Sequence, residues 1–113
     1  MSGTELTADE WKRADALARE LARDVDRNEV GKVITYMRRT RDTQKVSTLL
    51  QRLPRSSFVR TQRTRGYLER IGRAWSRHLQ GLPDERALLV ASWAFRLMTY
   101  YQDKYVVDTY RRR

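Results

Sequence analysis

Apolar residues recur at spacings of three and four along most of the chain, which is the pattern of one face of an α-helix. Five successive segments carry this pattern: residues 7–26, 28–41, 42–53, 57–79 and 84–110. No segment alternates with the period of two residues that is typical of a half-buried β-strand. The pattern predicts an all-α fold, a compact bundle of about five helices.

Residues that start or stop helices lie at the boundaries of these segments. Thr7, followed by Glu10, has the form of a capping box, and Asp42 is a good N-cap for the third segment. Pro54 ends the third segment, and Gly81 ends the fourth in the left-handed cap position. These signals support the division of the chain into separate helices.

The fifth segment differs from the others because it is apolar on nearly every face between Ala87 and Met98. A helix of this kind is typically buried on all sides. We therefore expect a central, largely buried C-terminal helix with Asp84 as its N-cap. Arg96 interrupts the apolar run, and it either marks one exposed face or pairs with a buried acid. The tryptophans expected in the core are Trp11, Trp75 and Trp93.

The chain has 113 residues, enough for one hydrophobic core, and the Pro/Ser joint at residues 54–57 is too short for a domain linker. We predict a single helical domain over residues 1–113, with residues 1–6 and 111–113 flexible. No apolar run approaches the ~20 residues that span a bilayer, and the N-terminus has no signal-peptide pattern. The expected location is the cytoplasm, with no membrane partner.

Charge is unevenly distributed. The chain has 24 Lys and Arg against 14 Asp and Glu, a formal net charge of +10. Residues 1–29 carry five basic and eight acidic side chains, residues 30–81 carry thirteen and two, and residues 82–113 carry six and four. Most of the basic residues are Arg, whose planar guanidinium binds phosphate in a bidentate manner. This composition is typical of a protein that binds a polyanion.

The fourth segment combines an apolar face with a stripe of arginines. At about 100° per residue, Arg63, Arg70 and Arg77 stack along the helix axis beside Arg73, and Ser56 or Ser57 would cap the helix. A face of this kind can be simple solvated surface, but on such a surface we expect Glu to alternate with Arg. The only acid between residues 57 and 79 is Glu69. The apolar face is made of Tyr67, Leu68, Ile71, Ala74, Trp75 and Leu79.

Three further arginines end the second segment, which is more than helix capping requires, and one opens the fourth. With the stripe, they form the set that we expect to bind nucleic acid through its phosphates. Gly66 and Gly72 lie inside the fourth segment, where we favour close approach of a neighbouring helix over that of a ligand. The expected binding residues are Arg38, Arg39, Arg41, Arg60, Arg63, Arg70, Arg73 and Arg77.

Residues that carry out catalysis are scarce. The chain has no cysteine and a single histidine, His78, which we expect to be a half-buried packing residue. Asp103 and Asp108 are five residues apart and do not share a helix face. No Gly-rich phosphate loop is present. We therefore expect no enzymatic activity, no cofactor and no metal site.

Three features, in this order, resemble the small subunits of CRISPR effector complexes, in particular those of type III. They are the apolar helix around residues 30–37, the sequence RTQRTR at residues 60–65, and the closing sequence WAFRLMTYY at residues 93–101. The resemblance covers about residues 28–107. It implies a non-catalytic helical subunit, present in several stacked copies beside other subunits, that holds the guide–target duplex or the displaced strand through phosphate contacts.

Two other functions fit the same residues. The third and fourth helices could form a helix-turn-helix regulator of DNA, although the arginines run along the whole fourth helix instead of clustering at its N-terminus. The chain could also be an interaction scaffold or inhibitor whose basic surface meets an acidic protein. For self-association, we expect the acidic first helix of one copy to contact the basic middle of the next.

Overall fold

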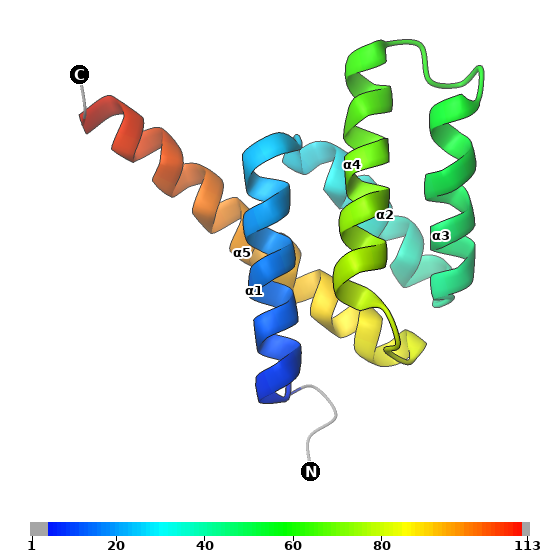
Figure 1. The fold of residues 1–113 in the computed structure, drawn as a ribbon, viewed down its shortest axis with the longest axis horizontal. Helices are drawn as coiled ribbons and strands as arrows, with labels where there is room; N and C mark the ends of the chain where they lie inside the picture. Colours follow the sequence, from blue (N-terminus) through cyan, green and yellow to red (C-terminus); the bar gives the residue numbers. More distant parts are fainter. Residues whose placement is uncertain (1–4, 112–113) are drawn as a thin grey trace.

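Five α-helices and one short 3₁₀ helix make up residues 5–111, the part of the chain that this computed structural model describes, and this part contains no β-strand (Figure 1). Side chains are described for residues 5–104. The predicted all-α bundle is confirmed. The elements are α1 (Ala8–Asp24), α2 (Arg27–Thr40), α3 (Thr43–Arg52), η1 (Leu53–Arg55), α4 (Gln62–Leu79) and α5 (Asp84–Arg111).

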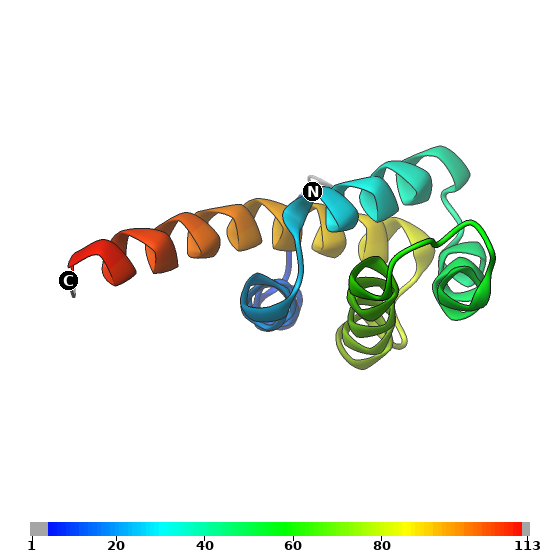
Figure 2. The same cartoon turned by 90° about the horizontal axis from the view of Figure 1, so that it is seen from above.

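The helices form two layers. In Figure 1, α1, α4 and α3 lie side by side, and α2 and α5 cross behind them. Figure 2, seen from above, separates the two sets into a lower and an upper layer. The molecule measures 46 × 42 × 20 Å, so each layer is about one helix thick. The longest helix, α5, packs chiefly against α1 and α2.

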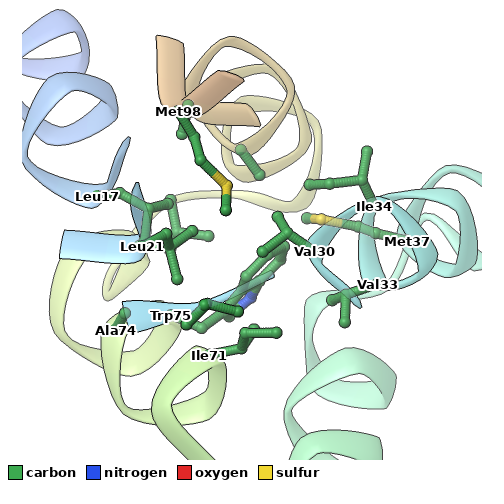
Figure 3. Packing of buried hydrophobic residues seen from close by; sticks show 14 of the residues in the cluster. Leu17, Leu21, Val30, Val33, Ile34, Met37, Ile71, Ala74, Trp75 and Met98 are labelled. Atoms are coloured by element: carbon green, nitrogen blue, oxygen red, sulfur yellow. The ribbon is translucent and has the colours of Figure 1, made fainter. Parts of the chain in front are cut away.

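One hydrophobic core lies between the layers. Trp75 of α4 is 3% exposed, and apolar side chains from α1, α2 and α5 converge around it (Figure 3). The second segment follows its predicted pattern, since its four apolar positions at helical spacing are all buried. Each large side chain buried in this way contributes about 1.5–3 kcal/mol to folding. The core residues labelled in Figure 3 are Leu17, Leu21, Val30, Val33, Ile34, Met37, Ile71, Ala74, Trp75 and Met98.

Two aspartates satisfy the first backbone amides of α3. Asp42 is the predicted N-cap, and its Oδ1 accepts hydrogen bonds from the amides of Gln44 at 2.9 Å and Lys45 at 3.2 Å. Asp84, expected to cap the fifth helix, instead lies in the first turn of α5, and its Oδ1 accepts from the amide of Thr43 at 2.9 Å. The hydrogen bonds that Asp84 accepts from the Thr43 hydroxyl and amide lower the pKa of Asp84. Asp84 therefore ties the start of α5 to the start of α3.

Some helix boundaries differ from the prediction. The N-cap of α2 is Asp26, so α1 ends and α2 begins slightly earlier than expected. The N-cap of α4 is Thr61, and the helix predicted over residues 57–61 is wrong. The reason is local, because the Ser56 hydroxyl donates to the Leu53 carbonyl at 2.9 Å and closes the 3₁₀ turn instead of capping α4.

The predicted flexible ends are only partly described. Residues 1–4 and 112–113 lie outside the described residues. Leu6 is partly buried against the core, and the Glu5 carbonyl accepts a hydrogen bond from Arg86 at 2.7 Å. The described start of the chain is therefore tied to α5, contrary to the prediction for residues 1–6.

The helix α5 is not buried on all sides, as its composition had indicated. Among its described side chains, residues 84–104, the buried positions form one stripe, and Leu89 and Leu97 outside this stripe are only half-buried. The other helices cover the inward side of α5 and leave its outer side to solvent, as the two layers in Figure 2 show. The buried positions are Ala87, Val90, Ala91, Ala94 and Met98.

Of the three tryptophans expected in the core, Trp75 is buried, Trp93 is half-buried against the core, and Trp11 is exposed. Trp11 is 41% exposed and packs against half-buried Trp93, with ring centroids 5.2 Å apart. The guanidinium of Arg96 lies 5.0 Å from the centre of the Trp93 ring, a cation–π contact. Arg96 thus marks the exposed face of α5, the first of the two alternatives considered for it.

The two glycines inside α4 have different surroundings. A Cβ atom at Gly72 would lie 3.5 Å from Leu50 of α3, so the expected close approach of a helix is confirmed there. A Cβ atom at Gly66 would meet nothing within 4 Å, so the same expectation is wrong for Gly66. Gly81, after α4, has a φ of 82° and adopts the predicted left-handed cap.

We expect Gly66→Ala to raise the free energy of unfolding by about 0.5–1 kcal/mol, because alanine loses less backbone entropy in a helix and finds open space here. Gly81→Ala is the matched control. It should lower the free energy of unfolding by about 1 kcal/mol, because its backbone is left-handed. Urea denaturation measures both changes, and a loss of stability in Gly66→Ala would contradict the open surroundings of this residue.

An ion pair with a buried carboxylate joins the N-terminal ends of α1 and α5. Glu10 is 5% exposed, and its carboxylate accepts hydrogen bonds from Arg86 and, as the predicted capping box requires, from the Thr7 amide at 2.8 Å. The Arg86 Nε atom lies 2.8 Å from Glu10 Oε2. Hydrogen bonds from Arg86 and Thr7 lower the pKa of Glu10 to about 2.

Because folding lowers this pKa, the stabilisation by Glu10 is complete above its ordinary value of 4.5 and is lost as the pH falls towards about 2. We expect Glu10→Gln to cost about 2–3 kcal/mol at pH 7 and much less at pH 2.5. Chemical denaturation of both proteins at the two pH values measures this. Glu85→Gln, at an exposed carboxylate, should cost less at pH 7. Equal losses at pH 7 would contradict a special role for Glu10.

Candidate nucleic-acid interface

The eight arginines predicted to bind nucleic acid do not form one continuous stripe. The helices that carry them place Arg63, Arg70 and Arg77 beside α1, Arg73 beside α3, and the others at the end of α2 or before α4. The heptad spacing predicted a shared face of α4 correctly. It could not indicate that this face borders the acidic helix of the same chain.

Arg77 forms an ion pair with Glu20 of α1. The second Glu20 oxygen, Oε2, lies 3.5 Å from Nε2 of His78, whose side chain is 18% exposed. His78 is therefore the half-buried packing residue that its position predicted. The carboxylate of Glu20 receives both contacts, so Arg77 and Glu20 join α4 to α1 within the chain.

Arg63 and Arg70 also make contacts inside the molecule. Arg70 Nη1 donates to the Asp24 carbonyl at 3.1 Å, where a cation stabilises the C-terminal end of α1. Arg63 Nε donates to the Tyr67 hydroxyl at 2.8 Å, and this bond raises the pKa of the Arg63 guanidinium. Both arginines are exposed, but part of their hydrogen-bonding capacity is already used.

The arginines at the end of α2 lie on its outer side. Arg38 and Arg39 line a groove of about 770 Å³ beside Phe95 of α5. Arg38 and Arg41 line a smaller hollow of about 320 Å³ next to the acidic first turn of α5. Arg41 ends α2 with a φ of 52°, a left-handed conformation that favours glycine. These residues form a separate basic area.

Arg60 lies in the loop before α4, not in the first turn of the helix. Its neighbour Val59 is 7% exposed and belongs to the core. The Val59 carbonyl accepts a hydrogen bond from Arg65 Nη2 at 3.4 Å. The loop that carries Arg60 is thus attached to the body of the bundle.

A groove of about 1030 Å³ runs between α3 and α4, where Arg73 lies with two arginines that the sequence analysis did not select. Arg52 ends α3 and Arg55 ends η1, and both line this groove. Arg77 also reaches its edge, and Glu69 is the one acid among the described lining residues. The α3–α4 groove therefore carries an excess of guanidinium groups on an open surface.

Arg52 and Arg55 were missed because their place in the groove depends on the turn between α3 and α4. They belong to the same basic block as the selected arginines, residues 30–81, and that signal was available in the sequence. Arg73, which lines the same groove, is distant in sequence. Only the antiparallel return of α4 beside α3 brings the three arginines to one groove (Figure 1).

The segment that supplies most of this groove, residues 38–73, is strongly basic, and Arg77 at the edge of the groove is paired with Glu20. Residues 38–73 contain eleven basic and two acidic side chains. Of the two acids, Asp42 caps α3, and Glu69 makes no ion pair among the described side chains. All seven described ion pairs lie among residues outside this range. The positive charge of residues 38–73 therefore stays largely unneutralised within the described chain.

Other kinds of site find no support among the described residues. They contain no group of three or more His, Cys, Asp or Glu side chains placed to hold a metal ion. None of their helices is both long and apolar enough to cross a membrane. No family model, curated protein or solved structure with which the chain was compared matches it. The basic groove is the feature from which a function can be argued.

Proposed function

We propose that this chain is a non-catalytic protein that holds the backbone of a nucleic acid in the α3–α4 groove without reading its sequence. The observation that carries this proposal is the set of three arginines in the groove, Arg52, Arg55 and Arg73, none of which has an ion-pair partner among the described residues. Unpaired guanidinium groups on an open groove fit the phosphates of a polyanion.

The absence of sequence readout follows from the type of contact. Phosphate contacts fix the position of a strand, whereas base edges carry the sequence information. The groove lies between two helices of the protein, and neither helix projects alone as a recognition helix would. Binding through the groove should therefore depend strongly on salt and weakly on sequence.

We further propose that the chain acts as a small subunit of a CRISPR ribonucleoprotein effector complex, beside larger subunits and in several copies. This part rests on the resemblance over about residues 28–107, a range that includes every described residue lining the α3–α4 groove. A groove that holds a backbone suits a subunit that supports the guide–target duplex or the displaced strand.

The geometry of α3 and α4 argues against the helix-turn-helix alternative. That motif joins two helices at about 90–120° through a turn of three or four residues. Here α3 and α4 lie antiparallel, and residues 53–61 separate them (Figure 1). The second alternative, a scaffold that binds an acidic protein, would use the same basic surface. A measurement of nucleic-acid binding distinguishes it from our proposal.

We expect the triple variant Arg52→Gln, Arg55→Gln, Arg73→Gln to bind single-stranded and duplex RNA and DNA more weakly than the wild type. Each lost phosphate contact should reduce the slope of log K against log salt concentration by about one. Fluorescence anisotropy at several salt concentrations, with two unrelated sequences of each nucleic acid, measures the affinities and slopes. Circular dichroism verifies that the variant is folded.

The charge-matched control replaces three lysines away from the groove, Lys12→Gln, Lys32→Gln and Lys104→Gln, in α1, α2 and α5. It lowers the net charge equally, and we expect it to retain most of the wild-type affinity. Equal weakening in both triple variants would show general charge attraction instead of a groove. A wild-type protein that binds no nucleic acid at low salt would overturn the proposal in favour of an acidic protein partner.

A further inference from the structure

An aromatic side chain projects from the loop between η1 and α4. Phe58 is 87% exposed, more than the other exposed large hydrophobic residues among the described side chains, Tyr100 at 60% and Trp11 at 41%. Burying a phenylalanine normally contributes about 1.5–3 kcal/mol, and the described fold gains almost none of this at Phe58. Folding alone does not explain an aromatic residue at this position.

The backbone on both sides of Phe58 is held in place. The Ser56 amide donates to the Leu53 carbonyl at 3.0 Å, and the Val59 amide donates to the Ser56 carbonyl at 3.3 Å. The Val59 side chain is buried in the core, and its carbonyl accepts from Arg65. Phe58 is therefore presented to solvent by a loop whose neighbouring residues are anchored.

The surroundings of this loop are basic. Arg55 precedes it, Arg60 lies within it, and the sequence has no acidic residue between Asp42 and Glu69. Arg55 also lines the α3–α4 groove, so the loop adjoins the surface where we place the phosphate backbone. An acidic protein could meet these arginines, but an exposed flat ring in the same loop as arginines matches a nucleotide, which has a planar base beside its phosphates.

We propose that Phe58 stacks on an unpaired base of a single-stranded nucleic acid whose backbone continues into the α3–α4 groove, with Arg55 and Arg60 on the flanking phosphates. This inference rests on the proposed function and adds the class of ligand to it. A base inside a duplex is already stacked on its neighbours on both sides, so Phe58 favours a single strand over a duplex. Every base has a π-face, so this contact requires no particular sequence.

Three substitutions of Phe58 test the stacking. From the strength of base–aromatic stacking, Phe58→Ala should weaken binding to single-stranded RNA or DNA by about 5- to 150-fold. Phe58→Leu, which is apolar but not planar, should lose nearly as much, whereas Phe58→Trp should retain the affinity. Duplex affinity and the salt slope should stay as in the wild type, because no phosphate contact is removed. Fluorescence anisotropy with mixed-sequence strands and blunt duplexes provides these values.

Several outcomes would overturn the inference. They are wild-type affinity of Phe58→Ala for single strands, equal weakening for strands and duplexes, or full affinity of Phe58→Leu. Loss of binding by Phe58→Ala to vesicles of anionic and neutral phospholipid, with binding to strands unchanged, would also overturn it and assign Phe58 to a lipid surface. Thermal unfolding should show that Phe58→Ala folds as the wild type does, because the side chain is exposed.

The groove variant separates this inference from the proposed function. If the triple arginine variant loses affinity while all Phe58 variants bind single strands as the wild type does, the stacking is wrong and the phosphate-binding groove stands. If the wild type binds neither strands nor duplexes at low salt, the proposed function itself is wrong.

Discussion

The packing of α1 against α5 is the interaction on which the rest of the structure depends. Near the N-terminal ends of both helices, Arg86 pairs with the buried carboxylate of Glu10, so removal of Arg86 would leave a buried charge without its ion-pair partner. Farther along α5, the Tyr101 hydroxyl donates to Asp15, and Gln102 Nε2 donates to the Val25 carbonyl at 2.8 Å. These contacts fix α5 across the end of α1, and α2 and α4 then complete the core between the two layers (Figure 2).

The same packing determines which charges remain at the surface. The acids of α1 are largely engaged within the chain, where Asp15 accepts from Tyr101, which lowers its pKa, and Glu20 contacts Arg77. Asp24 is the acid of α1 without a side-chain ion pair among the described residues. Few carboxylates of α1 are therefore unpaired and able to contact the basic region of another copy. Self-association through that contact would compete with the ion pairs inside the chain. The basic region of residues 38–73 forms no ion pair with the described acids.

Local signals in the sequence were sufficient for most of the fold. The helical period placed Val30 and Met37 in the core, and the caps at Thr7 and Asp42 were predicted because a cap depends on residues within one turn. Asp84 was misassigned because its partner Thr43 is far away in the sequence. The candidate site was harder to predict for the same reason. A helical wheel groups arginines on one face of α4, but the neighbours of that face, α1 on one side and α3 on the other, are determined by tertiary packing.

Like charges on one surface repel each other and lower the stability of the folded state. The region of residues 38–73 contains eleven basic side chains, and the described acids form no ion pair with them. Arg52, Arg55 and Arg73 therefore contribute repulsion and little stabilisation in the free protein. A bound polyanion removes the repulsion and stabilises the fold through its own binding free energy. This unneutralised charge fits the binding surface that we propose better than a face that only stabilises the fold.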